Sequence, residues 1–140
     1  MTRETTTLIK RDVPDIGYLD RSIFTDMGFV QTVCAGDAIY ISGIAPLTDA
    51  TGTLEVVAGD FETQLRYVLD ILDRSLQSVG ANRCDLVAWT IYATDVGELA
   101  HSAPILREWV GVHPPTSTWI GVSSMIHPDQ KLELTATATR

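Results

Sequence analysis

The sequence predicts an α+β fold in which two helices pack on one face of a mixed sheet, and three observations support this prediction. Five short segments have the composition or alternation of β-strands. Two longer segments repeat apolar residues every three or four positions, as amphipathic helices do. Their order is ββαβαββ, typical of a two-layer sandwich. Since no repeat or linker divides the 140 residues, we expect residues 1–140 to form one domain.

The first two strands are expected over residues 29–34 and 38–42. A Gly-containing turn signal at residues 35–37 separates them, so the pair is predicted to form a hairpin. Residues 46–59 are rich in turn-forming residues and lack periodicity. This segment is predicted to be a loop with an exposed tip.

Two amphipathic helices follow from the apolar spacing. The first is expected to begin after the capping residue Asp60 and to end at Gly80. The second follows residues 95–98, which resemble a capping box, and stops at Gly111. The apolar stripes are Phe61, Leu65, Val68, Leu72, Leu76 and Val79 in the first helix and Leu99, Ala103, Leu106 and Val110 in the second.

Three further strands are expected over residues 86–94, 117–122 and 131–139. Because side chains alternate between the faces of a strand, the last strand should turn its apolar residues toward the helices and its polar residues away. The apolar face holds Leu132, Leu134, Ala136 and Ala138, and the polar face holds Glu133, Thr135, Thr137 and Thr139. If the last two strands pair, Ser117, Trp119 and Thr135 line one common surface.

This polar face carries hydroxyls and an aromatic residue but no helix of its own. Another subunit is the simplest cover for such a face, so the pattern predicts a homo-oligomer. Two interpretations of the residues on it remain open. They fill a subunit interface, or they line a small-molecule pocket, where polar groups converge beside an aromatic residue.

Composition excludes several classes of function. The net charge is −8 and the sequence pI is about 4.6, so the chain should repel nucleic-acid backbones. No apolar run approaches the roughly 20 residues of a membrane span, and residues 1–10 lack the apolar core of a signal peptide. We therefore expect a soluble cytoplasmic protein with neither nucleic-acid nor membrane partners.

The cysteines and histidines do not predict a metal site. Cys34 and Cys84 are far apart in the chain and are expected to be reduced structural thiols. The three histidines have spacings that fit no zinc motif, so neither a metal nor another cofactor is expected. His127, beside Asp129, could act as an acid or base if its loop folds over a cleft, although a loop histidine is more often solvated.

Several segments resemble the Rid family of reactive intermediate deaminases, also known as the YjgF family. The resemblance runs from about Gly28 to Arg140, and its pieces occur in the family's order and spacing. They are Gly28-Phe29-Val30-Gln31, residues 35–43 (AGDAIYISG), Asp60-Phe61-Glu62-Thr63-Gln64, Pro114-Pro115 and Leu132-Glu133-Leu134.

The resemblance implies a chorismate-mutase-like fold and a homotrimer with small-molecule pockets between subunits. Typical members hydrolyse imines or enamines such as 2-aminoacrylate without a metal or cofactor. In those members an arginine after the Pro-rich turn holds the substrate carboxylate, and a glutamate on the last strand positions water. Here Ser117 and Thr135 occupy these two positions, so both charged groups are absent.

The resemblance also assigns the remaining candidate residues. Phe29, Ser42 and Gly43 fall at the pocket wall and its backbone contacts, and Trp119 replaces a smaller residue. Glu133 is the carboxylate that could replace the missing general base. A substrate carboxylate could still be held by an arginine from elsewhere in the chain; the candidates are Arg66, Arg83 and Arg107.

Two hypotheses of function follow. The first is a divergent Rid-type enzyme that acts on an imine, enamine or related reactive carbonyl compound and is not an ordinary 2-aminoacrylate deaminase. The second is a non-catalytic trimer that binds a metabolite or another protein. A third is an endoribonuclease role, under which members of this family are often described, and it is the weakest because the chain is strongly acidic.

Overall fold

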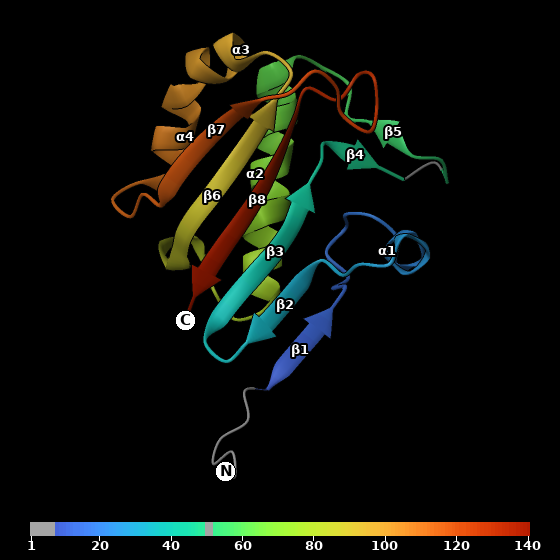
Figure 1. Ribbon diagram of the computed structural model, residues 1–140, viewed down its shortest axis with the longest axis vertical. Helices are drawn as coiled ribbons and strands as arrows, with labels where there is room; N and C mark the ends of the chain where they lie inside the picture. Colours follow the sequence, from blue (N-terminus) through green and yellow to red (C-terminus); the bar gives the residue numbers. More distant parts are fainter. Residues whose placement is uncertain (1–7, 50–51) are drawn as a thin grey trace.

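The main element of the computed structural model, which describes residues 8–49 and 52–140, is a six-stranded sheet (Figure 1). Its strand order is β1-β2-β3-β8-β6-β7, and the β6–β7 pair is parallel while the other pairs are antiparallel. The strands are β1 (Ile9–Asp12), β2 (Thr32–Ala35), β3 (Ala38–Ile44), β6 (Leu86–Ala93), β7 (Thr116–Gly121) and β8 (Leu132–Thr139). The predicted mixed sheet is therefore confirmed.

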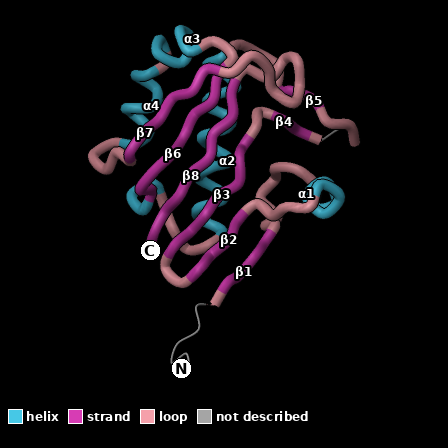
Figure 2. The backbone as a smooth tube through the Cα atoms, viewed as in Figure 1, coloured by secondary structure: helices cyan, strands magenta, loops and turns pink. Residues whose placement is uncertain are grey.

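Three of the helices lie on one side of this sheet. They are α2 (Phe61–Ser78), α3 (Val96–His101) and α4 (Ala103–Val110), and they lie behind the strands in the view of Figure 2. A fourth, α1 (Arg21–Met27), lies beside the sheet near β1 and β2 (Figure 1). No helix in the described part of the chain covers the near face of the sheet, which we call the open face.

The helix α2 forms as its sequence predicts. The Asp60 side chain accepts a hydrogen bond from the Thr63 backbone N–H at 3.0 Å, which satisfies one of the free donors of the first turn. Gly80, at φ +77°, allows the chain to leave the helix in the left-handed region. Phe61, Leu65, Val68, Leu72 and Leu76 of the predicted stripe are all buried, and Val79 packs partly against the core.

The core lies between α2 and the sheet. Leu132 and Leu134 of β8 are fully buried, and Ala136 and Ala138 are nearly so, which confirms the predicted apolar face. Ile91 of β6 continues this layer. Full burial of one such aliphatic side chain contributes about 1.5–3 kcal/mol, so this layer stabilises the strands that carry the candidate site.

Several predicted details are wrong. The helix expected after residues 95–98 is split into α3 and α4, because Pro104 stands at the start of α4 and has no backbone N–H to continue a helix. The last two strands do not pair, since β6 lies between β7 and β8. The first strand begins only at Thr32, because the Phe29 N–H is used to close the end of α1.

Short elements appear where the sequence predicted none. Strand β1 adds to the edge of the sheet, and α1 follows it. Strands β4 (Leu47–Thr48) and β5 (Glu55–Val56) pair within the predicted loop, and a 3-10 turn (Arg83–Asp85) precedes β6. The loop tip at residues 50–51 and the N-terminal residues 1–7 lie outside the described residues.

Within the described ranges, no helix has the length and apolar character needed to cross a bilayer. Over the same ranges, no three metal-ligating side chains come together. Both cysteines are free thiols; Cys34 is buried and Cys84 is exposed.

Candidate functional site

The predicted site residues fall into two groups on different strands. Ser42, Gly43, Glu133 and Thr135 lie on β3 and β8, which are neighbours, and we call them the β3/β8 group. Ser117 and Trp119 lie on β7 at the edge of the sheet, and we call them the β7 group. The remaining predicted position, Phe29, precedes β2 and is described with the β3/β8 group.

A β-bulge shapes the β3/β8 group. Ile41 is level with Ala136 and Ile44 is level with Leu134, so Ser42 and Gly43 together face the single residue Thr135. Bulges bend a strand and re-aim its side chains, and they occur often beside active sites. The bulge therefore brings the Ser42–Gly43 backbone and the Thr135 side chain to one place.

The segment before β2 holds Ser42 in place. The Ser42 hydroxyl donates to the Val30 carbonyl at 2.5 Å, and the Ser42 N–H donates to the Gln31 carbonyl at 2.9 Å. Phe29 directly precedes these acceptors, and its ring centroid lies 5.0 Å from that of the buried Phe24. Phe29 is 42 % exposed, so one side of its ring is available to a ligand.

The Glu133 carboxylate lies against the backbone of Gly43. A Cβ atom at position 43 would lie 2.6 Å from Glu133 Oε2, so only glycine leaves room for the carboxylate here. Gln130 Nε2 donates a long hydrogen bond of 3.4 Å to Glu133 Oε1 and a shorter one of 3.0 Å to the Leu132 carbonyl. Gln130 is 1 % exposed and was not predicted; its only signal is its place just before the strand.

Tyr18 supports the end of β3 from a distant part of the chain. Its hydroxyl donates to the Ala45 carbonyl at 3.2 Å and accepts from the Ala45 N–H at 3.0 Å. Burial raises the pKa of Tyr18, and the negative charge of Glu133 adds to the rise, so this phenol stays protonated. Sequence analysis missed Tyr18, because nothing local indicates a contact across 27 residues.

The β7 group is built around one hydrogen bond. The Trp89 indole Nε1 donates to Ser117 Oγ at 2.7 Å, and Trp89 is level with Ser117 on β7 and with Ala136 on β8. Since Ala136 belongs to the buried layer, Ser117 also points toward the helix side of the sheet. Trp119 follows two residues later on the same side, level with Ile91, and is 41 % exposed.

The expected common surface of Ser117, Trp119 and Thr135 is therefore wrong. Thr135 is level with Thr90 on β6, and Thr90 is level with Thr118 on β7, so this row of threonines lies on the open face. The alternation along β7 was predicted correctly, but the face was assigned wrongly. The physical reason is that β7 is an edge strand with all six residues exposed, so no burial contrast marks its inner face.

The open face is polar and aromatic. Thr90, Thr135 and Thr137 on it are half-buried, as is Tyr92. Toward its two sides Tyr40 and Ile120 are 51 % and 39 % exposed. The face therefore combines hydroxyls with exposed apolar surface.

Three other predicted polar side chains, Arg66, Arg83 and His127, are engaged elsewhere. Asp73 accepts two hydrogen bonds from Arg83, from Nε at 2.9 Å and from Nη2 at 2.7 Å, and Arg66 pairs with Glu62 at 3.0 Å. His127 Nδ1 accepts from the Asp129 N–H at 3.1 Å, within its own loop. The structure brings none of these groups into contact with the β3/β8 or β7 group.

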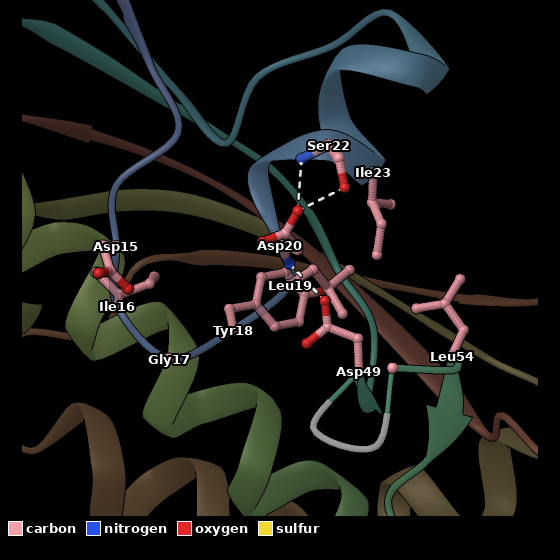
Figure 3. Close-up of a pocket in the computed structure, with 11 residues that line it drawn as sticks. Asp15, Ile16, Gly17, Tyr18, Leu19, Asp20, Ser22, Ile23, Asp49 and Leu54 are labelled. Carbon is pink, nitrogen blue, oxygen red and sulfur yellow. Dashed lines mark hydrogen bonds between the residues drawn. The ribbon is translucent and has the colours of Figure 1, made fainter.

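A cavity of about 630 Å³ lies between the segment around the start of α1 and the connection from β4 to β5 (Figure 3). Asp20 accepts from the Ser22 N–H and hydroxyl, which lowers the pKa of Asp20, and the Asp20 N–H donates to Asp49 at 2.6 Å. The lining includes the carboxylates of Asp15, Asp20 and Asp49 and none of the predicted site residues. This acidic cavity is distinct from the candidate site.

Comparisons with known proteins agree on one family. A sequence model described as endoribonuclease L-PSP matches residues 21–140. Protein DfrA of Myxococcus xanthus is 31 % identical over 106 residues, which are 76 % of this chain and 79 % of DfrA. The 3-aminoacrylate deaminase RutC of Acinetobacter baylyi is 24 % identical over 110 residues, 79 % of this chain and 85 % of RutC.

Solved structures have the same fold. The crystal structure of Escherichia coli TdcF with bound serine superposes with a TM-score of 0.78 at 24 % identity. The match covers 94 % of this chain and 99 % of TdcF. The predicted fold class is thereby confirmed.

Proposed function

Because the chain belongs to the endoribonuclease L-PSP family, also called the YjgF or Rid family, we propose that it acts on a small imine, enamine or related reactive carbonyl compound. The site would lie between copies of the chain, and the reaction would need no cofactor. RutC, which is named a 3-aminoacrylate deaminase, supports this class of chemistry. The ligand would be a small molecule, and the protein would act in the cytoplasm.

The observation that carries the proposal is the separation of the two groups of site residues. Ser117 and Trp119 point to the helix side at the edge of the sheet, whereas Thr135 lies on the open face with β6 between the strands. One copy cannot bring these side chains around one small ligand. A second copy that places its β7 group over the β3/β8 group would complete the pocket, as a closed homotrimer would allow.

Within this pocket the carboxylate of Glu133 would act as the general base. It would take a proton from water as the oxygen adds to the C=N carbon, and the nitrogen would take up a proton. The resulting carbinolamine would release ammonia and leave a carbonyl compound. The Thr135 hydroxyl and the Ser42–Gly43 backbone would hold the polar atoms, and Phe29 and Trp119 would stack on the ligand.

The ligand would differ from the short anionic substrates of typical members. A guanidinium grips a carboxylate with two charge-assisted hydrogen bonds, and the hydroxyl of Ser117 offers only one neutral hydrogen bond. With exposed aromatic rings at positions 29 and 119, the site favours a flatter, less charged compound. The net charge of −8 speaks against RNA as the ligand.

The test is ammonia release from 2-aminoacrylate and from bulkier aromatic imines generated in situ. We expect the wild type to prefer the aromatic imines and Glu133→Gln to lower turnover by about 10²-fold or more. Glu108→Gln removes a carboxylate of α4 outside both groups and serves as the matched control, with unchanged turnover. Light scattering should give a mass of three times 15.3 kDa.

The outcomes separate the two classes of function. A wild type that binds aromatic carbonyl compounds but releases no ammonia would favour a non-catalytic metabolite-binding trimer. The neutral residues at positions 117 and 135 are the observation in favour of this second candidate. A monomeric mass in solution would contradict the pocket between copies.

A further inference from the structure

The hydrogen bond between Trp89 and Ser117 has a direction that chemistry alone decides. An indole N–H can only donate, whereas a serine hydroxyl has one proton and two acceptor lone pairs. At 2.7 Å between Nε1 and Oγ, Ser117 must accept this hydrogen bond. The single proton of Ser117 is then directed away from the indole.

Ser117 is exposed on its other side, where its proton is free to meet a ligand. We infer that Trp89 is a positioning residue that makes Ser117 a hydrogen-bond donor, and that the ligand carries a neutral acceptor, a carbonyl oxygen, at this point. This inference rests on the proposed function, because it assigns Ser117 to the ligand pocket. It deepens that proposal by naming the ligand group that the pocket selects.

The indole of Trp89 is buried and packed beside Ser117. Trp89 is 5 % exposed, and its ring centroid lies 5.8 Å from that of Trp109. The Arg83 guanidinium lies 4.5 Å from the centroid of Trp109 and donates at 3.2 Å to the Trp109 carbonyl. Arg83 is in turn held by its two hydrogen bonds to Asp73. These contacts fix the donor before any ligand arrives.

Trp119 supplies an apolar surface beside this donor. It lies two residues along β7 on the same side as Ser117, and it is 41 % exposed. Beyond it, Val96 of α3 lies against Gly121, 3.6 Å from where a Cβ at that glycine would be. A flat compound that stacks on Trp119 would place an attached oxygen toward Ser117. An aromatic or conjugated carbonyl compound meets both conditions.

The inference is tested with two neutral compounds of similar size, acetophenone, which only accepts, and aniline, whose amine donates. Affinities are measured by calorimetry on the assembled protein. We expect the wild type to bind acetophenone about tenfold more tightly than aniline, the value of one net hydrogen bond. Trp89→Phe, which frees the serine to rotate, should remove the preference by strengthening aniline binding.

Ser117→Ala should remove the preference in the opposite way, by weakening acetophenone binding about tenfold. Ser117 is exposed on an edge strand, so this variant should stay folded although the Trp89 N–H loses its acceptor, and the test holds even if Trp89→Phe does not fold. Ser117→Thr keeps the hydroxyl and should restore the preference. Tyr67→Phe removes a hydroxyl of α2 that donates to the Leu47 carbonyl, away from Trp89, and is the matched aromatic control, with the preference unchanged.

The results decide the inference independently of the enzyme proposal. A preference that survives both Trp89→Phe and Ser117→Ala overturns it, and so does a wild type that binds neither compound. A preference without ammonia release upholds the inference and contradicts the enzyme proposal. Ammonia release with no acceptor preference upholds the enzyme proposal and overturns the inference.

Discussion

The β3/β8 group and the β7 group are held in place in different ways. Strand β8 is paired on both sides, and its alternate residues are buried, so register and packing orient Glu133 and Thr135. Strand β7 is paired on one side only and all six of its residues are exposed. There Ser117 is oriented by one hydrogen bond from Trp89. Central positions are thus set by the whole sheet, and the edge position depends on a single partner.

The largest effect should separate the two strands by stability. Leu134→Ala removes a fully buried side chain of β8 and should lower the free energy of unfolding by about 2–5 kcal/mol. Ile120→Ala, on β7 and 39 % exposed, should cost less than about 1 kcal/mol in dilute protein. Denaturant unfolding of both variants measures the difference.

The stabilities of the same two variants can also be compared at different protein concentrations. If a second copy covers the open face, Ile120→Ala should cost more at high concentration, because assembly adds to the stability of the folded chain. A cost that does not change with concentration would mean that Ile120 stays outside any interface between copies.

A smaller effect should follow from Ser117→Arg, which introduces a positive charge on the edge strand β7. Arginine cannot accept a hydrogen bond, so the buried Trp89 N–H loses its partner at a cost of about 1–3 kcal/mol. Ser117→Thr keeps the acceptor and should stay within about 0.5 kcal/mol of the wild type. Unfolding midpoints measure both, and a Ser117→Arg variant as stable as the wild type would refute the role of this hydrogen bond.

A small change in stability is expected for Gly43→Ala, although its effect on turnover should be large. The new Cβ would displace the flexible Glu133 carboxylate, so unfolding should change by less than about 1 kcal/mol while ammonia release falls about tenfold or more. Gly43→Ala in a Glu133→Ala background should show no further loss of either quantity. An additive loss in the double variant would place the effect outside the contact between these residues.

Much of the fold could be predicted because its signals are local. The stripe of α2, the cap at Asp60 and the alternation of β8 each depend on residues a few positions apart, and the structure confirms them. The position of β6 between β7 and β8 could not be predicted, because strand order depends on how distant segments pack. Local signals also mark two features that the sequence analysis missed: Pro104 for the break between α3 and α4, and Asp20 and Gly28 for the ends of α1.

The same distinction between local signals and long-range packing applies to the candidate site. The sequence alone establishes the residue types at the candidate positions, including the neutral side chains of Ser117 and Thr135. The placement of these two residues on opposite sides of the sheet, and of Glu133 against Gly43, depends on how distant segments pack together. Contacts such as Tyr18 with Ala45 and Trp89 with Ser117 join segments 27 and 28 residues apart. They arise from the register between strands and the packing of the core, which no short-range pattern of residues encodes.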